Sequence, residues 1–415
     1  MSETSKKHVV VVGCGIVGVS TAIWLQRHGQ QVTLVDRTGP AAGTAYGNAG
    51  ILAACSVIPV TVPGILKKAP GMLMDRFSPL FMRWSYLPSL LPWLYRYLGH
   101  ANLDENRRIA QALYPLLNDS LKQHQDLSEG TEASSFVHPD YYLFGFRDRS
   151  GYDNEKPLWD IRRDLGFNWE ELGVEELRSI LPEIKQEINF GIRFDQHGRI
   201  SDPGRYVKSL AKHAYQNGAN SLTGEATDVV ADNGKVTGVV IDGQKVDCDA
   251  MVVATGAWSG PLTSKLGFKV PLETERGYHI ELVNPSHMPA HPIMIASGKF
   301  VITPMEGRIR CAGIVEFGGL EAEASENPIK LLKQQVNNLM PDVRYDHIDE
   351  WMGHRPAPED SIPYVGEVPG YQGAYLGFGH HHVGLTGGPK TGRILAELIS
   401  NDSSQVDLTP YRVLR

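Results

Sequence analysis

Apolar positions near the start of the chain follow two different spacings. Residues 8–12 are a continuous, mostly β-branched run, as in a parallel strand that is buried on both faces. Apolar residues then recur at helical spacing through Leu25, and Gly29 follows the last of them. A second apolar run over residues 31–35 finishes at Asp36. The pattern predicts a strand, a helix and a second strand parallel to the first.

Three glycines lie in the turn between the first strand and the helix. Gly13, Gly15 and Gly18 form GxGxxG, in which the first makes the tight turn, the second lets backbone approach a pyrophosphate, and the third lets helix pack on strand. The helix N-terminus offers free amides to phosphate. Asp36 is spaced to accept hydrogen bonds from ribose hydroxyls and would repel a 2′-phosphate, which disfavours NADP. NAD and FAD remain.

Two distant segments favour FAD. Residues 226–253 contain Asn-Gly at 233–234 and Asp-Gly at 242–243, which predicts short strands joined by tight hairpins. They lead into ATGAWS at 254–259, a second glycine turn that would close over the same adenylate. From about Gly388 an amphipathic helix follows a turn rich in glycine and histidine, and its N-terminus would stabilise negative charge on a reduced flavin. A simple NAD domain has no need of these segments.

Composition limits the domain count and the partners. A chain of 415 residues is long for one core, which predicts two domains. The net charge of −7 provides no basic surface for nucleic-acid phosphates, so we expect no nucleic-acid partner.

The four cysteines lie far apart, and the adjacent histidines 380–382 are expected to diverge in an extended turn. We therefore predict no metal site.

One apolar stretch, residues 77–98, could suggest a membrane. Its Arg83, Arg96 and three prolines argue against a spanning helix, and we predict a pair of short buried helices. The alternative is a surface that rests on lipid or on a partner chain. Because no secretory segment precedes residue 8, we expect a cytoplasmic protein, with peripheral contact at the inner face of the cytoplasmic membrane left open.

Five motifs together resemble the FAD-dependent D-amino-acid oxidoreductases, a family that includes glycine oxidase, sarcosine oxidase and the bacterial D-amino-acid dehydrogenases. They are GCGIVG with Asp36, TAYGNAG at 44–50, ATGAWS at 254–259, GHRPAPEDSIPYVG at 353–366 and GFGHHHVGLTGGPKTG at 377–392. The last two most resemble D-amino-acid and D-hydroxyproline dehydrogenases. The 353–366 motif has no cysteine where the sarcosine-oxidase branch attaches its flavin, so the resemblance implies noncovalent FAD.

The resemblance also implies which residues contact the cofactor. The N-terminal motif would bind ADP, with support from the 254–259 turn; the 44–50 motif would lie along the diphosphate and flavin, and the C-terminal motif at the pyrimidine edge. The expected cofactor-binding residues are Gly13, Gly15, Ile16, Val17, Gly18, Asp36, Arg37, Asn48, Ala49, Gly50, Val229, Thr255, Gly256, Gly384, Leu385 and Thr386.

On the substrate side, the resemblance implies four candidate catalytic residues. Arg355 lies where family members place the arginine that binds the substrate carboxylate, and its planar fork suits that group; the alternative is a structural ion pair. Tyr278 lies in a strand where members place an active-site tyrosine or histidine, and simple packing is its alternative; His279 would point to the opposite face. His380 and His382, on one side of an extended turn, would tune the flavin or keep the substrate amine neutral.

We therefore predict a mixed α/β flavoprotein of two domains, of the α+β type. A Rossmann-like FAD-binding domain would be built from residues 1–55, 195–260 and 345–415. Residues 56–194 and 261–344 would form a substrate domain with helices, in which strands within 274–283, 299–305 and 308–317 make an antiparallel sheet over the flavin.

The predicted reaction is oxidation of a small D-amino acid or a cyclic secondary amino acid, such as D-proline or D-hydroxyproline. Hydride would pass from the α-carbon to flavin N5, and a quinone or oxygen would then accept the electrons. Three alternatives stay open: a flavin-dependent 2-hydroxy-acid dehydrogenase, the flavin subunit of a hetero-oligomeric dehydrogenase, and an NAD-only dehydrogenase. Assembly into a homo-oligomer also stays open.

Overall fold

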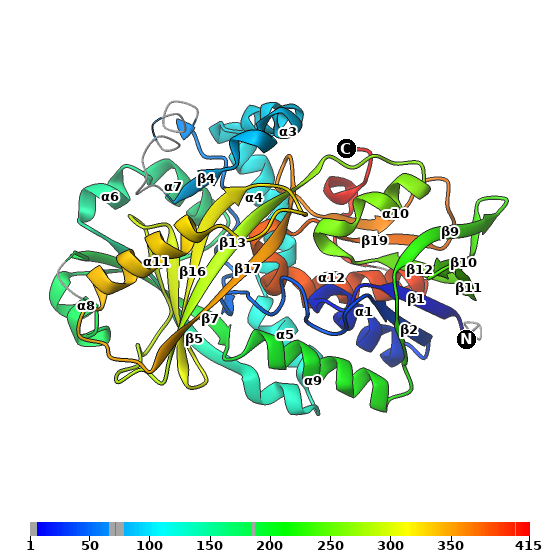
Figure 1. Ribbon diagram of the computed structural model, residues 1–415, viewed down its shortest axis with the longest axis horizontal. Coiled ribbons are helices and arrows are strands. Elements are labelled where there is room, and N and C mark those ends of the chain that lie inside the picture. Colours follow the sequence, from blue (N-terminus) through cyan, green and yellow to red (C-terminus); the bar gives the residue numbers. More distant parts are fainter. Residues whose placement is uncertain (1–5, 66–70, 72–78, 185–186, 403) are drawn as a thin grey trace.

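Two large sheets organise the molecule, one at each end of its long axis (Figure 1). The computed structural model describes residues 6–65, 71, 79–184, 187–402 and 404–415. Segments that are far apart in the sequence meet in each sheet, so the chain passes repeatedly between the two ends. The mixed α/β architecture that the sequence predicts is confirmed.

The smaller of these sheets has six strands in the order β18-β19-β12-β1-β2-β8. Its strands are β1 (His8–Val12), β2 (Gln31–Asp36), β8 (Asn220–Thr223), β12 (Ala250–Val253), β18 (Tyr364–Glu367) and β19 (Ala374–Phe378). All neighbours are parallel except β18, which is antiparallel to β19. Valines of β1 pack alternately into the cores on the two faces, which explains their continuous run.

Different layers cover the two faces of the six-stranded sheet. Helices α1 (Ile16–Arg27) and α12 (Gly384–Ile399) pack against each other, and α1 also contacts α9 (Pro203–Gln216). The other face packs on α10 (Gly260–Lys265) and on an antiparallel meander of β9 (Ala226–Asp232), β10 (Lys235–Ile241) and β11 (Gln244–Asp247). Positive φ angles at 233–234 and 242–243 confirm the two hairpin turns.

The larger sheet has ten strands, with the main order β17-β13-β16-β15-β14-β5-β7-β3 and with β4 beside β16 and β6 beside β7. Its strands are β3 (Ile51–Leu52), β4 (Leu80–Met82), β5 (Val137–Phe146), β6 (Glu170–Leu172), β7 (Phe190–Ile200), β13 (Leu272–Val283), β14 (Ile293–Ile295), β15 (Phe300–Met305), β16 (Arg308–Phe317) and β17 (His347–Pro358). The expected antiparallel pairing of β13, β15 and β16 is confirmed. Strand β17 pairs with β13 along its whole length, so the residues just after 345 extend this sheet.

Helices surround the larger sheet and the junction between the sheets. The other described helices are α3 (Leu87–Gly99), α4 (Leu103–Leu117), α5 (Ser120–Ser128), α6 (Arg149–Asp153), α7 (Lys156–Asp164), α8 (Val174–Ile180) and α11 (Glu326–Leu339). Helix α11 packs on β13 and β16, while α4 and α5 contact α12. Within the described residues, no helix is both long and apolar enough to cross a membrane.

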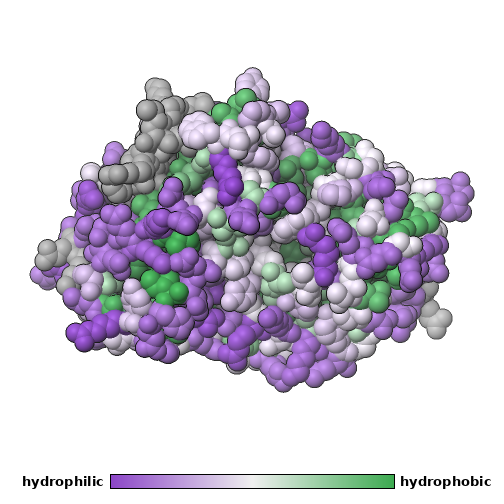
Figure 2. Space-filling view, viewed as in Figure 1, coloured by the Kyte–Doolittle hydropathy of each residue, from purple (hydrophilic) through white to green (hydrophobic). Residues whose placement is uncertain are grey.

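The prediction of two short buried helices over residues 77–98 is wrong. Residues 77 and 78 lie outside the described residues; the rest form β4, a short 3₁₀ turn and the single helix α3. Apolar residues line two faces of α3, and only the face with Leu90, Trp93 and Tyr97 is buried. Leu91 and Tyr95 are 52% and 84% exposed, so this helix leaves an apolar surface uncovered. Figure 2 shows apolar patches on a largely polar face, one of them near the place of α3 in Figure 1.

Candidate functional site

In the glycine turn after β1, two glycines lie directly against other backbone atoms and a third has free space beside it. A Cβ on Gly13, whose φ is 108°, would lie 2.3 Å from a backbone oxygen just after β12, and one on Gly18 would lie 1.8 Å from the carbonyl oxygen of Gly13. A Cβ on Gly15 would meet nothing within 4 Å. Gly15 is also the N-cap of α1 and provides no side-chain cap. The amides of Ile16 and Val17 are therefore open to a phosphate, as the pyrophosphate of FAD requires.

Asp36 is held at the end of β2 by backbone amides. Its Oδ2 accepts a hydrogen bond from the amide of Cys14 at 2.8 Å, and its Oδ1 accepts from two amides of the next turn. The Arg37 guanidinium lies over the Trp258 ring, 5.0 Å from its centre, which joins this turn to residues 255–256. The two segments expected on the adenosine side of the cofactor thus lie together.

Two side chains of the larger sheet hold the loop at 46–50. Nη1 of Arg310 donates to the carbonyl oxygens of Tyr46 and Asn48, at 3.0 and 2.5 Å. Nδ1 of His279 lies 3.1 Å from the carbonyl oxygen of Gly47. Since Arg310 is fully buried and also binds Glu281, the loop is fixed against the face of the sheet that carries these side chains.

The start of α12 lies beside the end of that loop. The Thr386 hydroxyl donates to the carbonyl oxygen of Ile51 at 3.3 Å, directly after the expected flavin contacts at 48–50. The helix begins at Gly384, four residues earlier than the sequence suggested, and has no side-chain cap. The amides of 384–386 are therefore free to face negative charge. Together with the Gly15 turn and Asp36, these groups fit the phosphate, ribose and ring of FAD.

Arg355 lies on β17 directly across from Glu275 on β13. Its side chain is half-buried and donates to the carbonyl oxygens of Ile314 and Gly313, at 3.2 and 3.4 Å. Burial lowers the pKa of Arg355, and the nearby Glu275 carboxylate opposes that shift. Gly277 makes room for it, because a Cβ there would lie 2.2 Å from the guanidinium carbon. The remaining N–H groups can bind a carboxylate.

One predicted site residue lies in an apolar core and a second packs against another core. The Tyr278 hydroxyl donates to the Glu316 carboxylate and accepts from the amide of Ser325, and its ring packs in the core beneath α11. Because side chains alternate along β13, Tyr278 is on the face opposite Glu275, and the structure does not bring it to Arg355. Val229 is half-buried on β9 and packs against the core of the meander.

The expected geometry of the histidine run is wrong. Residues 381–383 form a 3₁₀ turn, and His381 adopts a left-handed conformation with φ of 49°. His380 therefore points away from His382 and its Nε2 lies 2.8 Å from the Thr391 hydroxyl on α12. Burial lowers the pKa of His380 to about 4, so this imidazole is neutral near pH 7. The adjacent His381 and His382 converge instead of diverging.

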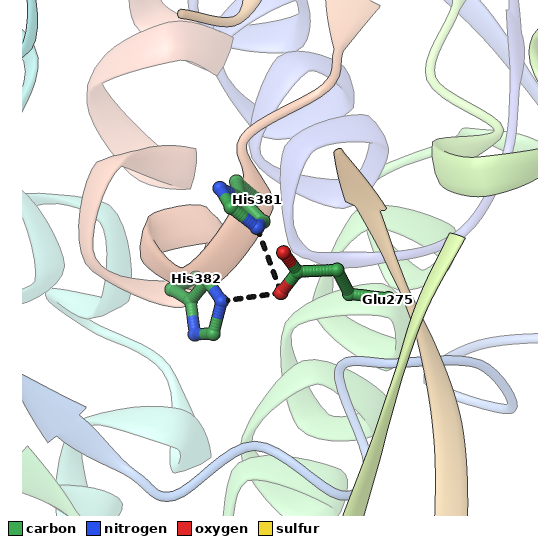
Figure 3. A group of neighbouring side chains, drawn as sticks. All are labelled: Glu275, His381 and His382. Carbon is green, nitrogen blue, oxygen red and sulfur yellow. Dashed lines mark hydrogen bonds and ion pairs between the residues drawn. The ribbon is translucent and has the colours of Figure 1, made fainter. Parts of the chain in front are cut away.

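The point of convergence is one oxygen of Glu275 (Figure 3). Nε2 of His382 lies 2.7 Å from Oε2 and Nε2 of His381 lies 2.9 Å from the same atom. The Tyr97 hydroxyl donates to Oε1 at 3.1 Å. Glu275 is only 1% exposed; although burial favours its neutral form, the contacts with His381 and His382 hold the pKa of this carboxyl well below its usual value. Glu275 is therefore a buried anion.

Glu275, His381 and His382 are the kinds of side chain that bind metal ions, and one ligand atom from each lies within 4.8 Å of the other two. This group therefore has to be compared with the prediction that the protein has no metal site. Two atoms bound to one zinc ion at about 2.1 Å in a tetrahedral arrangement lie about 3.4 Å apart. The separations of 2.7 and 2.9 Å from Glu275 to His382 and His381 are both shorter, and the contact with His382 is a hydrogen bond.

Sequence reasoning missed Glu275, Arg310 and Tyr97. The signal for the first two was present: strands 272–283 and 308–317 each carry several charged residues among apolar ones, and a charge that is buried in a sheet needs a partner or a function. No local signal marked Tyr97, because its partner lies 178 positions further along the chain.

Comparison with known proteins identifies the family and confirms the fold. The family described as FAD dependent oxidoreductase matches residues 8–398. A protein named D-amino-acid oxidase from Bradyrhizobium diazoefficiens is 38% identical over 416 residues and 99% of each chain, and a D-amino acid dehydrogenase from the same organism is 29% identical over 98% of each. Glycine oxidase from Geobacillus kaustophilus has a similar fold, with a TM-score of 0.76 at 20% identity over 99% of each chain.

Proposed function

The chain belongs to the family of FAD-dependent oxidoreductases, and from that premise we propose that it oxidises a small D-amino acid or a cyclic secondary amino acid, such as D-proline or D-hydroxyproline, at its α-carbon. The names of the two Bradyrhizobium relatives support an amino acid of the D series. The observation that carries the proposal is the placement of Arg355: a half-buried cation on the same face of the sheet as Glu275, which His382 contacts.

In this function Arg355 binds the α-carboxylate through its free N–H groups and fixes the substrate's orientation. The substrate amine then lies toward His382, whose side chain is 35% exposed and whose pKa is lowered by burial, by His381 and by the charge of Arg355. The 13–18 turn, Asp36, the 46–50 loop and the start of α12 hold noncovalent FAD. When bound, FAD supplies the acceptor for the hydride that leaves the α-carbon.

Anaerobic bleaching of the flavin tests this function. The purified holoprotein is mixed with D-alanine, D-proline and D-hydroxyproline, with their L-enantiomers, and with the matching 2-hydroxy acids. We expect bleaching by one or more D-amino acids and none by the hydroxy acids. Bleaching by the hydroxy acids alone would support a 2-hydroxy-acid dehydrogenase, and bleaching only by a partner protein would support a subunit role. A colourless protein without extractable FAD would favour an NAD-only enzyme and refute the proposal.

Oxygen and a quinone are the two candidate electron acceptors. The uncovered apolar residues of α3 favour a quinone within a membrane, at the inner face of which the protein would bind peripherally. Release of hydrogen peroxide in air would identify oxygen as the acceptor. Reduction of a quinone in vesicles, without peroxide, would identify the quinone.

A further inference from the structure

We infer that Glu275 and His382 form a proton-accepting pair, in which His382 takes a proton from the substrate's ammonium group and Glu275 positions and stabilises the imidazole. The inference rests on the proposed function, because it requires an amino-acid substrate whose carboxylate is bound by Arg355. His382 is assigned a catalytic role and Glu275 a positioning role.

The contacts of Glu275 fix the tautomer of His382. An ionised carboxylate only accepts hydrogen bonds, so the nitrogen that lies 2.7 Å from Oε2 must carry a proton. In neutral His382 that proton is on Nε2, and Nδ1 presents a lone pair. Among the described residues no group hydrogen-bonds Nδ1, and in Figure 3 this nitrogen points away from Glu275. The side chain of His382 is 35% exposed, so a ligand and water can reach the ring.

Glu275 is itself held rigidly. Tyr97 binds its second oxygen, and burial together with Glu275 raises the pKa of the Tyr97 hydroxyl well above its usual value, so this group stays a neutral donor. His381 contacts Oε2 from a buried position and adopts a left-handed backbone that costs free energy for any residue with a Cβ. That strain is retained where it brings two imidazoles to one carboxylate.

The charges around His382 make proton transfer depend on the substrate. The groups that face His382 are Glu275 from β13, Arg355 from β17 and His381 from its own turn, and Tyr97 from α3 contacts Glu275. Burial, and then the neighbouring His381 and Arg355, lower the pKa of His382 to about 4 although Glu275 opposes them, so this imidazole is neutral near pH 7 before substrate binds. A bound zwitterion adds a carboxylate at Arg355, which offsets the new positive charge on His382.

The step balances in protons and electrons. One N–H bond of the ammonium breaks, its electron pair stays on the substrate nitrogen, and the proton forms a bond to Nδ1 of His382. The neutral amine can then stabilise the positive charge that develops at the α-carbon as hydride leaves it. The imidazolium afterwards releases its proton to water through its exposed edge.

Ring-nitrogen NMR of histidine-labelled holoenzyme tests the pair without turnover. The probe is 2-aminoisobutyrate, an amino acid that has no α-hydrogen to lose. His382→Gln identifies the resonances, and Glu275→Gln and His347→Gln, which changes an exposed histidine of β17, are compared with the natural protein. We expect the Nε2–H tautomer in the free holoenzyme, double protonation after the probe binds, and a mixture of tautomers in Glu275→Gln.

The pH profile of kcat/KM gives the second readout. In His382→Gln the acidic limb should move up by about two pH units, toward the pKa of the free amine, and activity should recover at high pH. An unchanged limb, a His382 ring that stays neutral with the probe bound, or stoichiometric metal in the purified protein would overturn the pair. If no amino acid bleaches the flavin of the natural protein, the proposed function itself fails, which is a different result.

Discussion

Glu275 and Arg355 are cross-strand partners on β13 and β17, and their side chains share one face of the larger sheet. Their hydrogen bonding differs. Glu275 accepts hydrogen bonds from Tyr97 at one oxygen and His382 at the other, with His381 at ion-pair distance, whereas the hydrogen bonds of Arg355 within the described residues go to two backbone oxygens, at 3.2 and 3.4 Å. The anion is therefore satisfied within the protein, and the cation keeps donors for an external carboxylate.

Replacing Arg355 should weaken carboxylate binding. We expect Arg355→Met to lower kcat/KM for the amino acid by roughly 100-fold, or about 3 kcal/mol, since it removes two charge-assisted hydrogen bonds. Arg355→Lys should recover part of this loss, because it restores the charge without the fork. Arg96→Met, which changes an exposed arginine, is the matched control. Unchanged inhibition by simple carboxylates in Arg355→Met would contradict the assignment.

Gly15 and Gly18 should respond differently to an added methyl group. Gly18→Ala places a Cβ 1.8 Å from the carbonyl oxygen of Gly13 and should reduce the stability of the apoprotein by about 1–3 kcal/mol. Gly15→Ala meets no protein atom within 4 Å and should leave the apoprotein as stable as before. It should nevertheless weaken FAD binding by about tenfold or more, since backbone must approach the pyrophosphate there.

Thermal unfolding of the two apoproteins and titration with FAD separate these effects. Equal FAD affinity in Gly15→Ala and the natural protein would show that the phosphates do not approach this residue. A fully stable Gly18→Ala apoprotein would show that the helix can shift to relieve the contact.

Short-range patterns were sufficient for the cofactor-binding end of the fold. Strand β1, the glycine turn, α1 and β2 follow one another within thirty residues, and each is specified by its own sequence. The hairpins at 233–234 and 242–243 are likewise encoded by the two residues of each turn.

The candidate substrate site could not be predicted in the same way, because its residues meet through tertiary structure. Glu275 and His382 are 107 positions apart. The left-handed conformation of His381 depends on its surroundings, since nothing in a run of three histidines indicates a positive φ. The extended-turn interpretation placed His380 and His382 together, whereas the 3₁₀ turn separates them.

A substitution at Tyr278 tests whether its side chain lies on the face of β13 opposite the candidate substrate site. Tyr278→Phe removes a hydroxyl that binds Glu316 and Ser325 on the face opposite Arg355. We expect the free energy of unfolding to fall by about 1–2 kcal/mol, because Glu316 loses a buried partner. The KM for the amino acid should stay within about twofold of its original value. A large rise in KM at unchanged stability would place the hydroxyl at the substrate instead.

Buried histidines should make the protein lose stability in mild acid. His124 is fully buried, with its two ring nitrogens 2.8 Å from the Tyr206 hydroxyl and 2.9 Å from the carbonyl oxygen of Leu385. Such a ring is neutral, and burial lowers the pKa of His124 to about 4. Burial also lowers the pKa of His380 to about 4 and that of His279 to about 3.

The direction in which the free energy of unfolding changes with pH follows from the protons that the folded and unfolded states bind. Between about pH 6.5 and pH 4 the unfolded chain takes up a proton at His124 that the folded protein does not, so the free energy of unfolding falls as the pH falls. The contribution of His124 should reach about 3 kcal/mol near pH 4. Denaturant unfolding of the apoprotein at several pH values measures the slope, which should be shallower in His124→Gln and unchanged in His347→Gln. Parallel slopes for the natural protein and His124→Gln would show that the buried ring accepts a proton as readily as an exposed one.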